Sequence, residues 1–193
     1  MKVSHYTLCV ILSLIMTNYI TIRERDECLG VGPGGISGFW YLLSTLKKMD
    51  YSGEYVCASS GCLSIVSKDL SVNDVYHLAK NRDNFSYTKN TFIHSIVNKI
   101  IKVPDVTILT MDTFGTCHFR KPRNKRELET LLIVTTNVPF MTRFNKEFDG
   151  GLCFYMYNNC INSIKLPIRK RFIEKLLDTN MTLDDLIYFY NYI

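Results

Sequence analysis

A serine in a sharp turn is the residue of this chain whose surroundings best suit nucleophilic chemistry. Ser59 lies within residues 57–61, C-A-S-S-G, between two short apolar runs. This order predicts a strand, a tight turn and a helix, with the Ser59 hydroxyl held at the end of the strand. The helix N-terminus would face negative charge that develops beside the hydroxyl. Gly61 supplies the trailing glycine of a G-x-S-x-G elbow, and Cys57 stands where the leading glycine is usual.

A glycine-rich loop precedes this turn. Residues 28–40 read C-L-G-V-G-P-G-G-I-S-G-F-W and lead into a helical pattern of apolar residues. Such a loop exposes backbone N–H groups beside a helix N-terminus, which makes an anion site. The paired N–H groups of Gly34 and Gly35 could form an oxyanion hole, which stabilises the alkoxide of a tetrahedral intermediate.

The same loop also fits a dinucleotide fingerprint. Residues 30–35 match G-x-G-x-x-G, a motif that requires an acidic ribose ligand about 20 residues later, at the end of a second strand. Asp50 and Glu54 are roughly in range, but Glu54 begins its predicted strand instead of ending it. This interpretation predicts NAD binding and leaves Ser59 and Asp149 without a role.

The third informative stretch is D-G-G, in which Asp149 is followed by Gly150 and Gly151. By itself this sequence is typical of a tight turn. The four histidines, at positions 5, 77, 94 and 118, all precede it. The order serine, acid, histidine of the α/β-hydrolases therefore cannot be met with Asp149 as the acid.

The order of these three stretches resembles the patatin-like phospholipase family. Residues 34–38, G-G-I-S-G, resemble its G-G-x-R-G oxyanion loop, with Ser37 in place of the arginine. Residues 57–61 resemble its G-x-S-x-G elbow, and residues 149–151 resemble its D-G-[GA] motif. Residues 127–140 are similar to the helix and S-x-x-x-P passage before the family's aspartate, so the resemblance runs from residue 28 to about residue 155.

The resemblance implies a Ser–Asp dyad that acts without histidine. Asp149 would be the general base on Ser59, and the N–H groups of Gly34 and Gly35 would hold the oxyanion. The activity it implies is hydrolysis of fatty acyl esters of phospholipids or neutral lipids, with a membrane surface as the substrate phase. Neither a metal, an organic cofactor nor a nucleic acid is expected. The supporting motif glycines are Gly38, Gly61, Gly150 and Gly151.

Two departures from the family pattern, Ser37 and Cys57, favour an alternative. In this alternative the chain has a patatin-like fold that has lost activity and serves as a membrane-bound or lipid-binding protein. An assay for serine-dependent turnover separates the two interpretations.

The elements that must position these residues follow from periodicity. Alternating strands and helices predict an α/β fold, and the resemblance implies a three-layer α/β/α arrangement with a central, mostly parallel sheet. Between the motifs, helical patterns run through residues 72–80 and 92–101, joined by a polar stretch. Residues 106–111 predict a buried strand and residues 126–132 a helix, followed by an extended stretch over 133–136 and a break at Pro139.

Length and composition predict one globular domain with an apolar N-terminal segment. The chain has 193 residues, 47% of them hydrophobic, and a formal charge of +5 that suits an anionic membrane surface as well as it suits a nucleic acid. Residues 1–22 contain an apolar run that is typical of a signal peptide, a short anchor or a packed helix. We therefore expect a lipid acyl hydrolase domain over residues 23–193, associated with membranes and reached through the secretory pathway if the segment is a signal.

The seven cysteines lie at irregular positions and form neither a C-x-x-C motif nor a cluster with zinc-ligand spacing. An odd number at irregular spacing does not indicate a disulfide framework. Mostly free, buried thiols are therefore expected.

Overall fold

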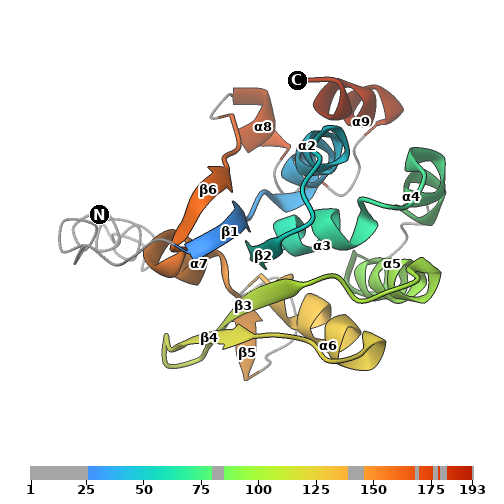
Figure 1. Ribbon diagram of the computed structural model, residues 1–193. Helices are drawn as coiled ribbons and strands as arrows, with labels where there is room; N and C mark the ends of the chain where they lie inside the picture. The colour runs from blue at the N-terminus through green and yellow to red at the C-terminus, as the bar shows by residue number, and fades with distance from the viewer. Residues whose placement is uncertain are drawn as a thin grey trace, which may run out of the picture.

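A computed structural model shows a mixed, six-stranded β-sheet with helices on both of its faces (Figure 1). The structure describes residues 26–79, 85–138, 146–167, 170–175, 178 and 182–192. The apolar segment at the N-terminus and the predicted break at Pro139 lie outside these residues. No helix in the described ranges combines the length and the apolar character that crossing a bilayer needs.

The sheet has the order β4-β3-β2-β1-β6, and β5 pairs with β3 off this path. Strands β1, β2, β3 and β6 are parallel neighbours, while β4 and β5 both run antiparallel to β3. The α/β class is therefore confirmed, but the sheet is mixed. The strands are β1 (Asp26–Val31), β2 (Glu54–Cys57), β3 (Val106–Asp112), β4 (Cys117–Arg120), β5 (Glu147–Asp149) and β6 (Cys160–Ile164).

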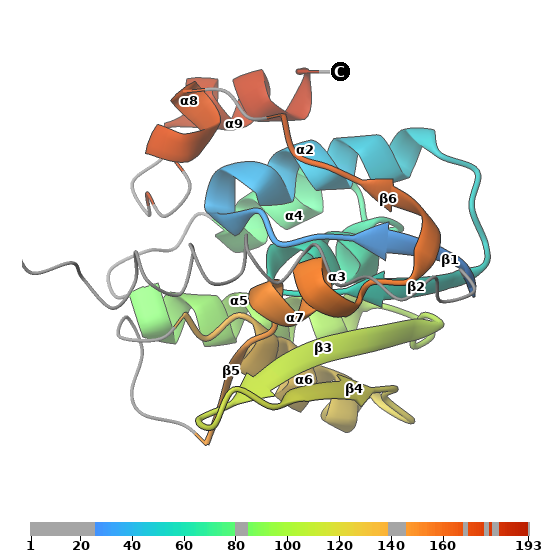
Figure 2. The ribbon, with the colours of Figure 1, turned by 90° about the vertical axis from the view of Figure 1, so that its left-hand side faces the viewer.

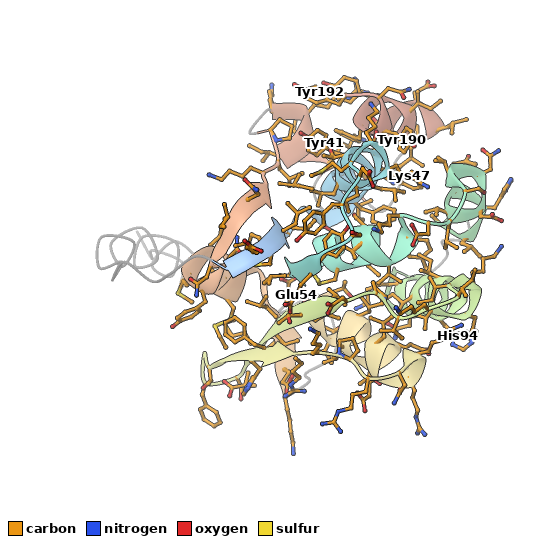
Figure 3. The ribbon with its side chains drawn as sticks, in the orientation of Figure 1. Tyr41, Lys47, Glu54, His94, Tyr190 and Tyr192 are labelled. Carbon is orange, nitrogen blue, oxygen red and sulfur yellow. A yellow bond between two sulfur atoms is a disulfide. The ribbon has the colours of Figure 1, made fainter. Side chains whose placement is uncertain are left out.

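The helices cover the two faces of the sheet unequally. Most of them lie on one face, and α7 lies on the other, in front of β1 and β2 in the second view (Figure 2). At the edge of the helical layer, α9 packs along α2, where the rings of Tyr41 and Tyr192 make an edge contact 6.1 Å apart (Figure 3). The helices are α2 (Gly35–Lys48), α3 (Ser60–Ser67), α4 (Val72–Ala79), α5 (Phe85–Lys99), α6 (Lys125–Thr135), α7 (Gly151–Tyr157), α8 (Lys170–Glu174) and α9 (Leu183–Tyr190).

The two faces bury separate apolar clusters, as the alternation of side chains along a strand requires. On β3, Val106 and Ile108 belong to the main core beneath the larger set of helices. Leu109 belongs to a smaller cluster with Cys153 and Phe154 of α7. The sheet is thus covered on both sides at the level of the β3 centre.

Helix α6 extends further than the sequence predicts. The expected extended stretch over residues 133–136 is wrong, since the helix continues to Thr135. Its buried residues Leu128, Leu131, Leu132 and Thr135 keep one face of the helix against the core. This burial outweighs the β preference of the Ile-Val-Thr run that ends the helix. The polar stretch over residues 81–90 is also partly helical, because α5 begins at Phe85.

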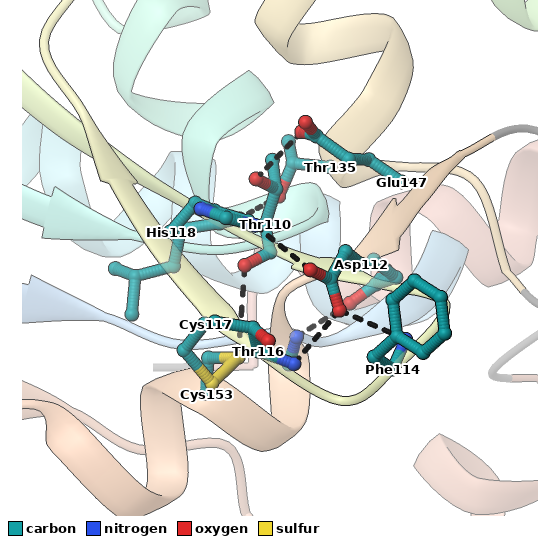
Figure 4. The surroundings of a disulfide bond; sticks show 12 residues. Thr110, Asp112, Phe114, Thr116, Cys117, His118, Thr135, Glu147 and Cys153 are labelled. Carbon is teal, nitrogen blue, oxygen red and sulfur yellow. Dashed lines mark hydrogen bonds and ion pairs between the residues drawn. A yellow bond between two sulfur atoms is a disulfide. The ribbon is translucent and has the colours of Figure 1, made fainter.

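The expectation of free thiols is wrong. Six of the seven cysteines form three disulfides, Cys28–Cys160, Cys57–Cys62 and Cys117–Cys153, and Cys9 lies outside the described residues. Each bond joins neighbouring elements of the fold: β1 to β6, the end of β2 to α3, and β4 to α7 (Figure 4). These neighbours are set by sheet topology, which the spacing of cysteines in the sequence does not reveal.

Candidate active site

The serine turn has the geometry of a nucleophile elbow. Ser59 connects β2 to α3 with φ 54° and ψ −132°, and it is the one non-glycine residue with positive φ in the described part of the chain. Such a conformation strains an L-residue and persists only where its surroundings hold it. The strand, sharp turn and helix expected from the sequence are therefore confirmed, with Ser59 at the turn.

Gly61 lets the elbow pass directly over the end of β1. A Cβ atom at this position would lie 2.3 Å from the carbonyl oxygen of Val31 and 2.5 Å from that of Gly32. Cys57 takes the place of the leading glycine without blocking the turn, because its side chain is buried in the main core. There it bonds to Cys62, so a disulfide spans the turn that carries Ser59.

Asp149 meets Ser59 at this turn. The Ser59 side chain is hydrogen-bonded to the Asp149 carboxylate, and the N–H of Gly151 donates to Asp149 Oδ1 over 2.7 Å. The backbone N–H of Asp149 donates to the carbonyl of Asn137 over 2.9 Å. Two residues that are far apart in the sequence, one after β2 and one ending β5, thus form a hydrogen-bonded pair.

The surroundings of Asp149 suit a general base. Burial raises the pKa of Asp149 to about 6, and this effect exceeds the opposing hydrogen bonds from Ser59 and Gly151 and the positive charge of Lys89. A carboxylate with a pKa near the working pH accepts a proton from an alcohol more readily than an ordinary aspartate does. At neutral pH the group is still ionised and able to act as the base.

The glycine loop lies beside both residues. The N–H of Gly34 donates to the buried Ser60 Oγ over 2.9 Å, which ties the loop to the elbow. Gly35 has φ 57° and begins α2, so the first N–H groups of this helix have no acceptor within it. A Cβ atom on Gly151 would lie 3.2 Å from Cγ of Pro33, which shows how closely the D-G-G turn approaches the loop.

Two further motif glycines differ in how closely other atoms approach the position of an added Cβ atom. A Cβ atom on Gly150 would lie 2.1 Å from the carbonyl oxygen of Leu109, so only glycine lets the Asp149 turn cross β3. A Cβ atom on Gly38 would lie 3.0 Å from Leu166, a side chain that can shift. Gly150 is therefore the stricter requirement of the two.

Thr135 is a part of the site that sequence reasoning missed. Its hydroxyl donates to the carbonyl of Leu109 over 2.7 Å and accepts from the backbone N–H of Ser59 over 2.9 Å. It therefore fixes the strained residue to β3. The signal that could have indicated it is the T-x-x-x-P pattern from Thr135 to Pro139, which matches the S-x-x-x-P passage of the resemblance.

Thr135→Val is expected to lower the free energy of unfolding, although the side chain keeps its shape. The substitution leaves the N–H of Ser59 and the carbonyl of Leu109 unpaired and buried, which costs about 1–3 kcal/mol of unfolding free energy. Urea unfolding measures this loss, and Thr135→Ser, which keeps the hydroxyl, is the matched control. Equal stability of the valine and serine variants would contradict the role of the hydroxyl.

Two of the described histidines pair with acidic residues other than Asp149. His94 on α5 pairs with Glu129 over 3.0 Å (Figure 3), and His118 pairs with Asp112 over 3.3 Å at the β3–β4 hairpin (Figure 4). Among the residues that the structure describes, no group of three or more histidine, cysteine, aspartate or glutamate side chains could hold a metal ion.

Glu54 does not lie where a ribose ligand would be needed. It begins β2, whereas the glycine loop follows the opposite end of the parallel neighbour β1. Its Oε1 accepts from Thr107 over 2.8 Å and pairs with Lys121 (Figure 3). The dinucleotide interpretation therefore has no support from Glu54.

Comparison with known proteins adds no family assignment: neither a protein-family model nor a curated protein matches this chain.

Proposed function

We propose that the chain is a serine acyl hydrolase, which cleaves fatty acyl esters of phospholipids or neutral lipids with a Ser59–Asp149 dyad. The observation that carries the proposal is the strained Ser59, held in an elbow and hydrogen-bonded to an aspartate whose pKa is raised. Strain, a perturbed carboxylate and a backbone loop rich in N–H donors meet at one point, as the site of an activated nucleophile requires.

In the proposed reaction, Ser59 Oγ attacks the ester carbonyl while its proton passes to Asp149. The proton then passes to the departing alcohol, which leaves an acyl group on Ser59. Asp149 next takes a proton from water as the water oxygen attacks the acyl carbonyl. The fatty acid leaves and the proton returns to Ser59, so Asp149 ends ionised.

The oxyanion of each tetrahedral intermediate is assigned to the glycine loop. The N–H of Gly35 and the N-terminus of α2 are the donors that the geometry favours. The N–H of Gly34 is engaged by Ser60 Oγ, so it joins them only when that hydroxyl rotates away. The resemblance to the patatin-like family, by contrast, assigns the oxyanion equally to the N–H groups of Gly34 and Gly35.

A lipid substrate is supported by the surface that follows Asp149. Helix α7 exposes four large side chains directly after the D-G-G turn: Leu152, Tyr155, Met156 and Tyr157. Apolar groups at the edge of a site suit a fatty acyl chain, and a net charge of +5 suits an anionic membrane. The three disulfides fit an oxidising compartment, which agrees with a secretory route.

Labelling with a fluorophosphonate probe tests the proposal. Purified protein is expected to form a stable phosphonyl adduct at Ser59, located by mass spectrometry of the modified peptide. Ser59→Ala should remove the label, while Ser60→Ala should keep a label on Ser59. A panel of phospholipids and neutral lipids then identifies the substrate.

A second candidate is an inactive lipid-binding protein, which is favoured by the engagement of the Gly34 N–H and by Ser37 in place of the family's arginine. Absence of labelling in a folded protein that still binds lipid vesicles would support this candidate and overturn the hydrolase.

A further inference from the structure

A buried lysine lies behind the candidate dyad. Lys89 of α5 is only 9% exposed. Its ammonium group donates to Asn137 Oδ1 over 2.5 Å and reaches the carbonyl oxygens of Thr136 at 3.4 Å and Ile133 at 3.5 Å. Burial of a charged lysine is unfavourable unless other groups compensate it, so its presence here requires a reason.

One set of contacts is structural. The carbonyl groups in the last turn of α6 carry the negative end of the helix, and they need partners beyond the regular helical pattern. The Lys89 ammonium is a second donor to such a carbonyl at Ile133, which also accepts from the Thr136 hydroxyl over 3.2 Å. An exposed lysine could do the same at less cost, so this contact does not by itself explain the burial.

The second set of contacts leads to Asp149. Because an ammonium group only donates, its contact fixes Oδ1 of Asn137 toward Lys89 and so sets the orientation of the amide. The backbone carbonyl of the same Asn137 accepts the N–H of Asp149 over 2.9 Å. Lys89 therefore holds the residue on which the backbone of Asp149 rests.

The charge of Lys89 acts on the same aspartate. It lowers the pKa of Asp149 and so opposes the effect of burial. Asp149 in turn raises the pKa of Lys89, which burial lowers to about 8. The other groups that face Asp149 are the Ser59 hydroxyl, the Gly151 N–H and Tyr155 of α7, none of them a cation at neutral pH. The second acid of β5, Glu147, pairs with Arg120 instead.

We propose that Lys89 is a positioning residue for the Ser59–Asp149 dyad: its ammonium group fixes Asn137 behind the aspartate and offsets the buried negative charge. The inference rests on the proposed hydrolase function for its catalytic meaning. The effect of the Lys89 charge on the titration of the Asp149 carboxyl can be measured without any turnover.

The first experiment follows the Asp149 carboxyl directly. The protein is labelled with ¹³C at its aspartate carboxyl groups and observed by NMR. The resonance that disappears in Asp149→Asn is that of Asp149, and its chemical shift is then followed as the pH is varied. Lys89→Met is expected to move this titration upward by about one pH unit, since an opposite charge close to a carboxylate lowers its pKa by one to three units. Lys99→Met, which removes an exposed lysine of the same helix paired with Asp74, should leave it unchanged.

The second experiment measures the pH dependence of fluorophosphonate labelling. The acid limb of the rate is expected to move upward with Lys89→Met and to return toward the wild-type position with Lys89→Arg. A purely structural role would lower the rate at every pH without moving the limb. If Lys89→Met does not fold, Lys89→Gln, which keeps a donor and removes the charge, replaces it.

The two proposals fail in different ways. Absence of labelling in the wild type overturns the hydrolase, and the carboxyl titration still decides the role of Lys89. An unchanged titration of Asp149 in a folded, neutral Lys89 variant overturns the inference, even where labelling of Ser59 is intact.

Discussion

Replacing Asp149 with asparagine is expected to lower turnover about a thousand-fold, because the general base is lost while the side chain keeps its shape. The same substitution should stabilise the fold at neutral pH. The pKa of Asp149 is raised from an ordinary 3.8 to about 6. The protonated form is therefore favoured in the folded state, and stability is lost as the pH rises from about 4 through 6.

The size of this stabilisation follows from the shift. Above pH 7 the ionised carboxylate lowers the free energy of unfolding by on the order of 3 kcal/mol, which Asp149→Asn should restore. Below pH 4 the variant and the wild type should be equally stable. Urea unfolding at pH 4 and pH 7.5, together with lipid turnover at pH 7.5, measures both effects.

The control for Asp149→Asn is Asp50→Asn, at an exposed aspartate between α2 and β2. This variant should leave turnover unchanged. Near-normal turnover of Asp149→Asn would show that the dyad is wrong. Stability that does not depend on pH would show that the carboxylate is well solvated.

Gly61→Ala is expected to have the largest effect on the fold of any substitution at the site. Its Cβ atom would lie within 2.5 Å of two backbone carbonyl oxygens at the end of β1, and backbone atoms cannot move aside as a side chain can. We expect a loss of about 3 kcal/mol or more in unfolding free energy, typical of severe overpacking. The Ser59 label should also be lost, because the elbow must shift away from Asp149.

Gly115→Ala is the matched control for this prediction. Gly115 has φ 85° in the hairpin between β3 and β4, and nothing lies within 4 Å of an added Cβ atom. Its cost should be about 1–2 kcal/mol, from backbone conformation alone, and labelling of Ser59 should be unchanged. If Gly61→Ala behaves like Gly115→Ala, the contact of the elbow with β1 is looser than its geometry indicates.

The sequence predicted the two central residues of the site better than the residues that hold them in place. Ser59 and Asp149 carry signals that are local in the chain, a turn with small residues and an aspartate before two glycines. Thr135 carries only the T-x-x-x-P pattern that ends at Pro139, and Lys89 carries no such signal, because each acts through a contact made only in three dimensions. Thr135 even lies in a run of β-branched residues that favours a strand, and burial of one face of α6 decides against that preference.

The prediction of the fold failed at the short antiparallel strands and at the cysteines. β4 and β5 have only four and three residues, too few for an alternating pattern to emerge. The predicted buried strand over residues 106–111 is confirmed as β3, since a longer run of β-branched and apolar residues is a stronger signal. The disulfide partners depend on which strands become neighbours, and this cannot be read from spacing.

The position of β1 has a consequence for how the chain is made. β1 lies between β2, which follows soon after it, and β6, whose Cys160 is 132 residues beyond Cys28. During synthesis the edge of β1 that pairs with β6 stays free until this much later strand emerges. Cys57, Cys62 and Cys117 emerge earlier, so Cys28 can first be oxidised with the wrong partner. Where such a bond forms, it must be exchanged before Cys28 can pair with Cys160.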